Sequence, residues 1–267
     1  MSPQFQGHRP APLQTLAARL ATCLCAALAA APLLASLIAP GAAFAAERVV
    51  GSGRLVAEAR NVGEFEAIAL RGSFDVVVRQ GSATSLSITA DDNLLPLIEA
   101  VVEPGASSGG PRLTLRWKPG VSLTTKSKTQ VLVVTPRLVA VASSGSGDLR
   151  VESFSTPSLV LSLSGSGDAA LPGLKTDELR IGIAGSGDVK TEGEASRLKV
   201  NIAGSGDVLA KDLRVMEAVV SIAGSGDVAV QVQKKLTVSI AGSGNVTYSG
   251  EPEVTRSVAG SGTIKRR

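Results

Sequence analysis

The 267-residue chain has very few of the side chains on which most enzymes depend. It has one histidine and two cysteines, and aromatic residues make up only 3% of the sequence. His8, Cys23 and Cys25 all lie within the first 45 residues. If that segment is removed, no imidazole and no thiol remain. This excludes a Ser-His-Asp triad, a Cys-His pair, a zinc site of imidazole or thiolate ligands, and any disulfide bond.

Net charge and aromatic clusters are also scarce after residue 45. Removal of Arg9 and Arg19 leaves 25 basic residues against 23 acidic ones. This near-neutral net charge does not indicate the basic surface by which proteins bind nucleic acid. The aromatic side chains form no stripe of the kind that binds sugars, so we expect them to pack in the core or at its ends. They are Phe65, Phe74, Trp117, Phe154 and Tyr248.

The first 45 residues have the features of a secretory signal peptide. Arg9 and Arg19 give a positive start, an apolar run covers residues 20–39, and Ala-Phe-Ala at 43–45 resembles a cleavage site. A membrane anchor is the alternative, because the run is about long enough to span a bilayer. Pro32 and the small residues that follow the run favour cleavage. The sequence after residue 45 has no second apolar stretch, so we expect no membrane span in the mature chain.

One short phrase, Gly-Ser-Gly, occurs seven times in the second half of the chain. The steps between copies are 20, 20, 19, 20, 18 and 18 residues. A fixed period near twenty is typical of a solenoid, in which each repeat buries its apolar face against its neighbours. The first glycines of the seven copies are Gly145, Gly165, Gly185, Gly204, Gly224, Gly242 and Gly260.

From residue 139 onward, apolar and polar residues alternate. Before Gly204, for example, Leu198, Val200 and Ile202 share one parity, which predicts a strand with one buried face. Alignment of the copies places apolar residues in columns, as expected for a parallel β-solenoid with coils of 18–20 residues. The column two residues before the first glycine contains Ser143, Leu163, Ile183, Ile202, Ile222, Ile240 and Val258.

The Gly-Ser-Gly phrase itself continues the alternation. Both glycines fall on the inward parity, and the serine and the following residue fall on the outward one. An inward position at a corner has little room for a side chain, and positive φ is easy for glycine. We therefore interpret the phrase as a corner that stacks on itself rather than as a phosphate-binding loop, which occurs once and opens a helix.

The chain divides into three parts on this interpretation. Residues 1–45 are the signal peptide, residues 139–267 are the regular coils, and residues 46–138 are irregular first coils of the same β-helix with insertions. Residues 70–76 resemble an eighth, degenerate copy in which Phe74 replaces the second glycine.

The order of these segments resembles a known family. A signal peptide, then Gly-Ser-Phe-Asp-Val-Val-Val-Arg-Gln-Gly at residues 72–81, then a run of Gly-Ser-Gly-Asp coils is similar to the bacterial putative auto-transporter adhesin head, or GIN, domain. The resemblance covers residues 49–264. It implies an all-β fold, a right-handed, single-stranded parallel β-helix, in an exported protein. Adhesion is suggested by the family's name, and the family supplies no catalytic residues.

The residue after each Gly-Ser-Gly forms the only repeated ionisable row. Stacked carboxylates about 4.8 Å apart repel each other, by roughly 3 kcal/mol at an effective dielectric of 20. Hydrogen bonds from corner amides or serines would make the row tolerable. Calcium bound along the row is the alternative, because regularly spaced oxygen ligands suit that ion. The five candidates for such a metal ladder are Asp148, Asp168, Asp188, Asp207 and Asp227.

These observations predict an exported, non-enzymatic β-solenoid that acts as a structural or adhesin-like interaction module of the cell envelope. It would lie in the periplasm or at the cell surface and bind an envelope or surface ligand, either glycan or protein, without a cofactor. A polysaccharide-binding or polysaccharide-cleaving β-helix is the alternative, and a scaffold that associates through its ends is another. A cleft lined by unique charged residues would favour the enzyme.

Overall fold

The computed structural model describes residues 47–105 and 110–267. The predicted signal peptide, residues 1–45, lies outside the described residues. Those that are described belong to one compact unit, Ala45–Arg267. Within the described ranges, no helix is long and apolar enough to cross a membrane.

The second half of the chain is a stack of parallel coils, as the repeat predicts. Each Gly-Ser-Gly copy separates two strand segments, and every segment pairs in parallel with its equivalent one coil away. The strands are β10 (Ala140–Gly145), β11 (Leu149–Glu152), β12 (Ser155–Gly165), β13 (Ala169–Gly185), β14 (Val189–Gly204), β15 (Val208–Gly224), β16 (Val228–Gly242), β17 (Asn245–Ser249), β18 (Glu253–Gly260) and β19 (Thr263–Arg266).

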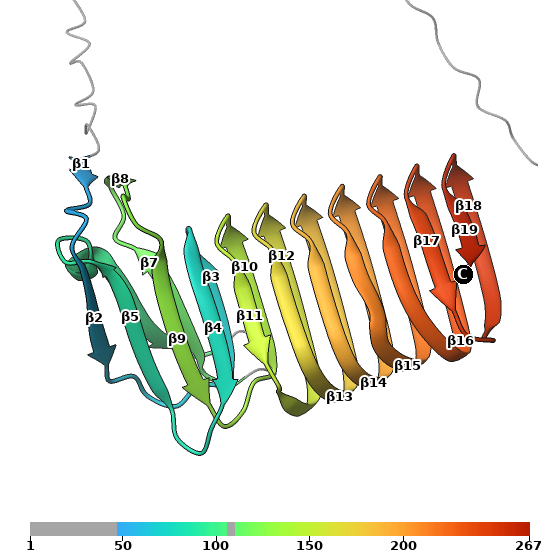
Figure 1. Ribbon diagram of the computed structural model, residues 1–267, viewed down its shortest axis with the longest axis horizontal. Helices are drawn as coiled ribbons and strands as arrows, with labels where there is room; N and C mark the ends of the chain where they lie inside the picture. Colours follow the sequence, from blue (N-terminus) through green and yellow to red (C-terminus); the bar gives the residue numbers. More distant parts are fainter. Residues whose placement is uncertain (1–46, 106–109) are drawn as a thin grey trace, which may run out of the picture. The chain divides into compact units, whose positions relative to one another are not determined.

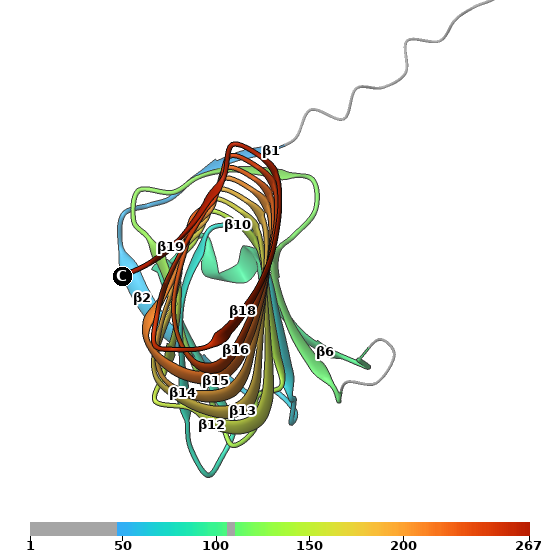
Figure 2. The same ribbon diagram turned by 90° about the vertical axis from the view of Figure 1, so that its right-hand side faces the viewer.

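Each coil has two faces and two edges. The long strands β13 to β16 run down one face, curve around the lower edge in Figure 1, and return up the other face to the next glycine corner. Seen along the stack, the coils overlie one another as flattened loops (Figure 2). We call the upper edge, formed by the seven Gly-Ser-Gly copies, the glycine edge. We call the lower edge, where residues 172–177 of β13 and their equivalents turn, the variable edge.

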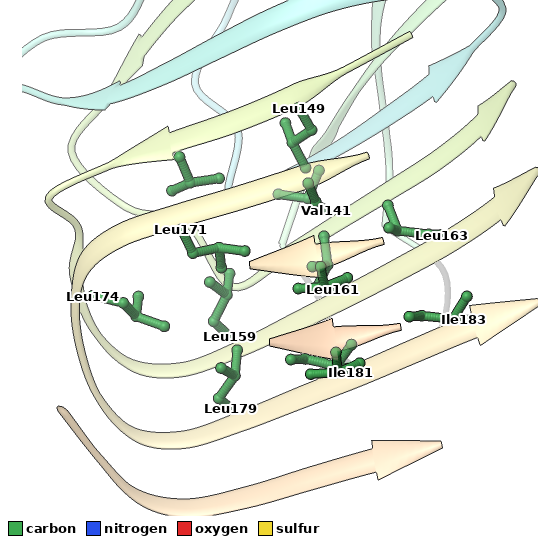
Figure 3. Close-up of a cluster of buried hydrophobic side chains, with 14 of the residues drawn as sticks. Val141, Leu149, Leu159, Leu161, Leu163, Leu171, Leu174, Leu179, Ile181 and Ile183 are labelled. Carbon is green, nitrogen blue, oxygen red and sulfur yellow. The ribbon is translucent and has the colours of Figure 1, made fainter. Parts of the chain in front are cut away.

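The core lies between the two faces and consists of the predicted apolar columns. Leu163 pairs in register with Ile183, and Ile183 with Ile202. Figure 3 shows such columns, with side chains from successive strands directed into the same interior. Leu159 and Leu179 belong to another column, four residues earlier in each coil, and both are completely buried. The fold is therefore a β-solenoid, and its coils are held together by continuous apolar contact and by backbone ladders.

The first half of the chain contains more varied structure. Its strands and one 3-10 turn are β1 (Glu47–Val50), β2 (Leu55–Arg60), β3 (Ala67–Arg71), β4 (Phe74–Gln80), β5 (Ser85–Asp91), η1 (Leu95–Leu97), β6 (Ile98–Glu103), β7 (Arg112–Trp117), β8 (Val121–Thr124) and β9 (Thr129–Thr135). Strands β3 and β4 form a coil that pairs in parallel with β10 and β11. Strands β7 and β9 form another, which pairs with β3 and β4 from the other side.

Coil geometry does not extend over the whole of residues 46–138. Strand β5 pairs antiparallel with β2 and β9, and β6 pairs antiparallel with β7. Figure 2 shows β6 projecting away from the stacked coils. The order in space also differs from the order in sequence, because the β7–β9 coil lies beyond the β3–β4 coil. Stacking in chain order would have placed it between that coil and β10–β11.

The degenerate copy at residues 70–76 lies in register with the true copies. Leu70 pairs with Ser143, and Val76 pairs with Leu149. Phe74, which replaces the second glycine, is buried and stacks on Trp117 with ring centroids 5.1 Å apart. A large side chain fits here because the adjoining β7–β9 coil has no Gly-Ser-Gly corner and presents the Trp117 ring instead, whereas each true Gly-Ser-Gly corner packs against the corner of the coil before it.

The last coil is less covered than the others. β18 and β19 pair with β16 and β17 on one side, and the described residues supply no strand on their other side. Val258 belongs to a core column but is 42% exposed. Arg256 pairs with Val238 and so occupies a position that is apolar in the preceding coils. A charge on the inward parity of an edge strand opposes pairing with another chain.

Candidate functional site

The glycine edge is built by direct contact between backbones. Gly204 has φ of +142°, which side-chain-bearing residues rarely adopt. Gly206 has ordinary φ, but a Cβ atom there would overlap the carbonyl oxygen of Gly187 and contact Ile183 Cγ2. The two glycines of a copy are therefore required for different reasons, the first by conformation and space and the second by space alone.

The predicted aspartate row runs along this edge and is linked by hydrogen bonds. The backbone N–H of each residue in the row donates to Oδ1 of the aspartate one coil before it. The distance is 2.9 Å from Asp188 N to Asp168 Oδ1 and 2.7 Å from Asp227 N to Asp207 Oδ1. The equivalent bond from Asp168 to Asp148 is longer, at 3.4 Å. Each bond places a donor against a carboxylate and offsets part of the repulsion along the row.

Both ends of the row have uncharged or oppositely charged partners. Lys128 Nζ lies 3.1 Å from Asp75 and 3.8 Å from Asp148, and these carboxylates raise the pKa of the Lys128 amine. At the other end, Asn245 donates its side-chain amide to Asp227, and Thr263 donates its hydroxyl to Asn245. The amide and hydroxyl continue the hydrogen-bonded row without adding charge.

The row has the geometry of a hydrogen-bonded corner. Within residues 47–105 and 110–267, no group of three or more His, Cys, Asp and Glu residues is placed to hold a metal ion. The calcium alternative for Asp148, Asp168, Asp188, Asp207 and Asp227 stays a hypothesis. Asp148, Asp168 and Asp188 of the row also line a hollow of about 400 Å³, together with apolar residues that include Val77, Ala170 and Leu209.

The variable edge contains a row of threonines that the repeated phrase does not reveal. Thr176 Oγ1 donates to the carbonyls of Pro157 and Glu178, at 3.2 and 3.1 Å. Thr156 and Thr135 make the equivalent pair of bonds in the two preceding turns. The hydroxyls therefore satisfy carbonyls where the coil turns, and they tie each turn to the previous one.

A groove of about 650 Å³ lies along the variable edge, over the turns of β12 to β16. Charged side chains on it come from different coils at equivalent positions: Lys175 pairs in register with Glu194, and Glu194 with Arg214. Arg214 forms an ion pair with Glu194. Among the described residues, Lys175 and Asp177 have no partner of opposite charge within 4 Å. The remaining lining residues are Ser155, Thr156, Pro157, Thr176, Ala195, Ser196, Met216 and Gln233.

The groove is the feature that sequence reasoning missed. Its residues differ from coil to coil, so no repeated motif marks them. One signal was available: Thr156 and Thr176 each stand eleven residues after the first glycine of a copy. Lys175, Glu194 and Arg214 are in phase when counted from the other side, since each stands ten residues before the first glycine of the next copy. Sequence spacing therefore locates the variable edge, but its groove depends on how each turn folds.

The repeated corner and the parallel coils define the class of protein, an all-β solenoid with coils of about twenty residues. The chain belongs to the family described as putative auto-transporter adhesin, head GIN domain, whose model matches residues 64–252. That range includes the degenerate copy and the first six Gly-Ser-Gly copies. The resemblance inferred from sequence is confirmed.

Solved structures share the fold along their whole length. A putative adhesin from Bacteroides fragilis is 26% identical, with 82% of this chain and 100% of that chain covered and a TM-score of 0.76. A putative adhesin from Parabacteroides merdae is 26% identical, covering 83% and 100%, with a TM-score of 0.63. A putative lipid binding protein from Parabacteroides distasonis, 24% identical over 83% and 100% with a TM-score of 0.68, shows the fold alone. None of the curated proteins compared with the chain matches it.

Proposed function

We propose that this protein is an exported, non-enzymatic, adhesin-like module that binds a ligand of the cell envelope or cell surface. Membership in a family described as adhesin heads is the observation that carries the proposal. The rigid stack of coils supports it, because side chains at equivalent positions of successive coils form one extended surface. Such a surface suits recognition of a long ligand, as in other solenoids.

The composition supports a role without catalysis. Residues 46–267 contain no histidine and no cysteine, so nucleophilic triads and imidazole-based acid–base chemistry are missing from this sequence range. No cofactor is part of the proposal. The ligand is a glycan or a protein, and a balanced charge makes nucleic acid an unsuitable partner.

The signal-like segment at residues 1–45 supports the proposed export, for which the periplasm and the cell surface are the two proposed destinations. Expression of the full chain in a bacterium, followed by fractionation and mass spectrometry of the N-terminus, tests this step. We expect a mature chain that begins near Ala46 and lies outside the cytoplasm. An uncleaved chain in the cytoplasm would contradict it.

Binding is tested with the mature chain coupled to fluorescent beads. We expect the beads to attach to whole bacterial cells or to purified envelope, and soluble chain in excess to compete. Beads coated with a heat-denatured chain serve as the control. Equal attachment of both bead types would contradict an adhesin-like role.

Self-association through the solenoid ends is a further proposal. The exposed last coil supports it, and the basic residues Lys265, Arg266 and Arg267 would oppose it by charge. Arg266 is paired with Glu251, and Arg267 N–H donates to the carbonyl of Tyr248. Deletion of residues 265–267 should increase the sedimentation coefficient at low salt. An unchanged monomer would mean that Arg256 or the coil itself protects this end.

Polysaccharide cleavage is the second candidate, and the groove at the variable edge favours it. Asp177 and Glu194 line the groove, and paired carboxylates are the groups that hydrolyse glycosidic bonds. Release of reducing ends from a polysaccharide, lost in both Asp177→Asn and Glu194→Gln, would replace the proposal of a non-enzymatic module. Release that persists in both variants would come from a contaminant.

A further inference from the structure

We propose that the groove at the variable edge binds an uncharged, extended glycan that runs along the stack, with about one sugar unit on each coil. This inference rests on the proposed adhesin-like function and names the ligand class and its site. The groove is lined by residues from Ser155 in β12 to Gln233 in β16, so it crosses several coils.

The register of the coils gives the groove a regular spacing. Lys175, Glu194 and Arg214 are paired in register on adjacent coils, and Asp177, Ser196 and Met216 stand two residues after each of them. Neighbouring strands are about 4.8 Å apart. This spacing is close to the length of one sugar unit in an extended chain. Each coil can therefore present its polar side chains to a successive unit of the same ligand.

The charges in the groove indicate that the ligand is neutral. The lining contains two cations, Lys175 and Arg214, and two anions, Asp177 and Glu194. A polyanion would be attracted by one pair and repelled by the other, so the groove offers it no net electrostatic gain. Sugar hydroxyls both donate and accept hydrogen bonds, and carboxylate, ammonium, guanidinium, hydroxyl and amide groups can all bind them.

The floor of the groove leaves its outer side chains available. Thr156 and Thr176 use their hydroxyls on backbone carbonyls, and Ala195 is buried. Asp177 and Ser196, in contrast, are exposed. The polar groups available to a ligand are therefore the exposed ones, such as Asp177 and Ser196. The threonine hydroxyls beneath them already have hydrogen-bond acceptors.

A peptide does not fit this edge equally well. A peptide that adds as a β-strand needs an unpaired strand edge. Strands β13, β14 and β15 pair with neighbours on both sides along the groove, so they present side chains and no free ladder. Met216 is the one large apolar side chain of the lining, which contains no Trp, Tyr, Phe, Leu or Ile, so it offers little of the apolar surface that anchors most protein–protein contacts.

The test measures binding of defined hexasaccharides to the full mature chain by calorimetry. The probes are cellohexaose and laminarihexaose, which are neutral and β-linked, and a β-linked mannuronate hexamer, which is anionic. We expect at least one neutral hexamer to bind and the mannuronate hexamer to bind at least tenfold more weakly. Tighter binding of mannuronate, or no binding of either neutral hexamer, would overturn the inference.

Matched variants locate the binding. Asp177→Ala should weaken binding about tenfold, because a hydrogen bond to a charged group is lost, and Ser196→Trp should abolish it by filling the groove. Asp212→Ala removes an exposed carboxylate outside the groove and should leave affinity unchanged. Far-UV circular dichroism checks that each variant is folded. Unchanged affinity in a folded Ser196→Trp would place the ligand elsewhere.

The two proposals fail in different ways. If beads coated with the chain attach to cells but no neutral hexamer binds, the glycan groove is wrong and the adhesin-like function stands. If neutral hexamers bind in the groove but the beads attach to no cell or envelope, the glycan site stands and adhesion is wrong.

Discussion

The two edges of the solenoid are built from the same coils but follow opposite rules. At the glycine edge, the same three residues recur in every copy, and backbone contacts backbone. At the variable edge, the equivalent positions hold Ser155, Lys175, Glu194 and Arg214, four side chains of different chemistry. Repetition in this chain therefore marks a steric requirement, whereas the variable edge has no such requirement and its side chains are free to differ from coil to coil.

Coil length follows the same division. The pairing register between neighbouring coils shifts only between the glycine corner and the end of the turn at the variable edge. The shifts lie at residues 171–174 for β13 and β14, at 190–192 for β14 and β15, and between 210 and 217 for β15 and β16. The strand segments before each corner remain in register from coil to coil. Differences between coils of 18, 19 and 20 residues are thus accommodated at the variable edge and leave the columns intact.

Insertion of one alanine should give the largest contrast between the edges. An alanine between Ser186 and Gly187 reverses the parity of the strand that follows, so we expect a loss of at least about 4 kcal/mol. An alanine between Pro172 and Gly173 falls where register already shifts, and we expect about 1 kcal/mol or less. Urea denaturation of both variants measures the difference. Equal losses would mean that the edges are equally constrained.

Substitution within one corner should have the next largest effect. Gly206→Val places a branched side chain against the Gly187 carbonyl, and we expect a loss of about 1–3 kcal/mol or more. Ser205→Ala, one residue away on the outward parity, should stay within about 0.5 kcal/mol. Denaturation midpoints compare the two. A greater loss in Ser205→Ala would show that the parity assignment is wrong.

Removal of a threonine hydroxyl tests what holds the variable edge. Thr176→Val keeps the shape but leaves the carbonyls of Pro157 and Glu178 without this donor, so we expect a loss of about 1–2 kcal/mol. Thr237→Val is the control, because Thr237 lies on the outer face of a coil and its hydroxyl makes no hydrogen bond within the described residues. It should change stability by less than about 0.5 kcal/mol. Similar losses in both would assign the effect to strand packing.

The smallest effect is expected from calcium at the aspartate row. A calcium ladder would gain about 2.7 kcal/mol per site at a hundredfold excess over the dissociation constant. The hydrogen-bonded row should gain nothing specific, so millimolar Ca²⁺ should shift the melting temperature no more than sodium chloride of equal ionic strength. A specific shift that disappears in the double variant Asp188→Asn, Asp207→Asn would establish a metal site at the glycine edge.

The regular part of the fold could be predicted from sequence because two independent patterns agree. The period of about twenty residues and the apolar–polar alternation both assign the same residues to the core columns. The columns through Leu163 and Leu198, and the corners with two glycines, follow from stacking one coil on another. The antiparallel strands β2, β5 and β6 could not be predicted in this way, since their partners recur at no fixed spacing. The groove at the variable edge could not be predicted for a related reason. It is formed by turns whose side chains differ from coil to coil and whose pairing register shifts.

The position of the β3–β4 coil has a consequence for the folding pathway. This coil is the first in sequence but the second in space, and its contact with the next coil joins residues 73 positions apart, as between Ser73 and Ser146. Later coils join residues only 18 to 20 positions apart. Closing the long loop costs more entropy and slows the search, whereas each later coil closes a short loop on a template that already exists. Folding should therefore have a slow nucleation step that needs the chain as far as Glu152, followed by fast, sequential growth toward the C-terminus.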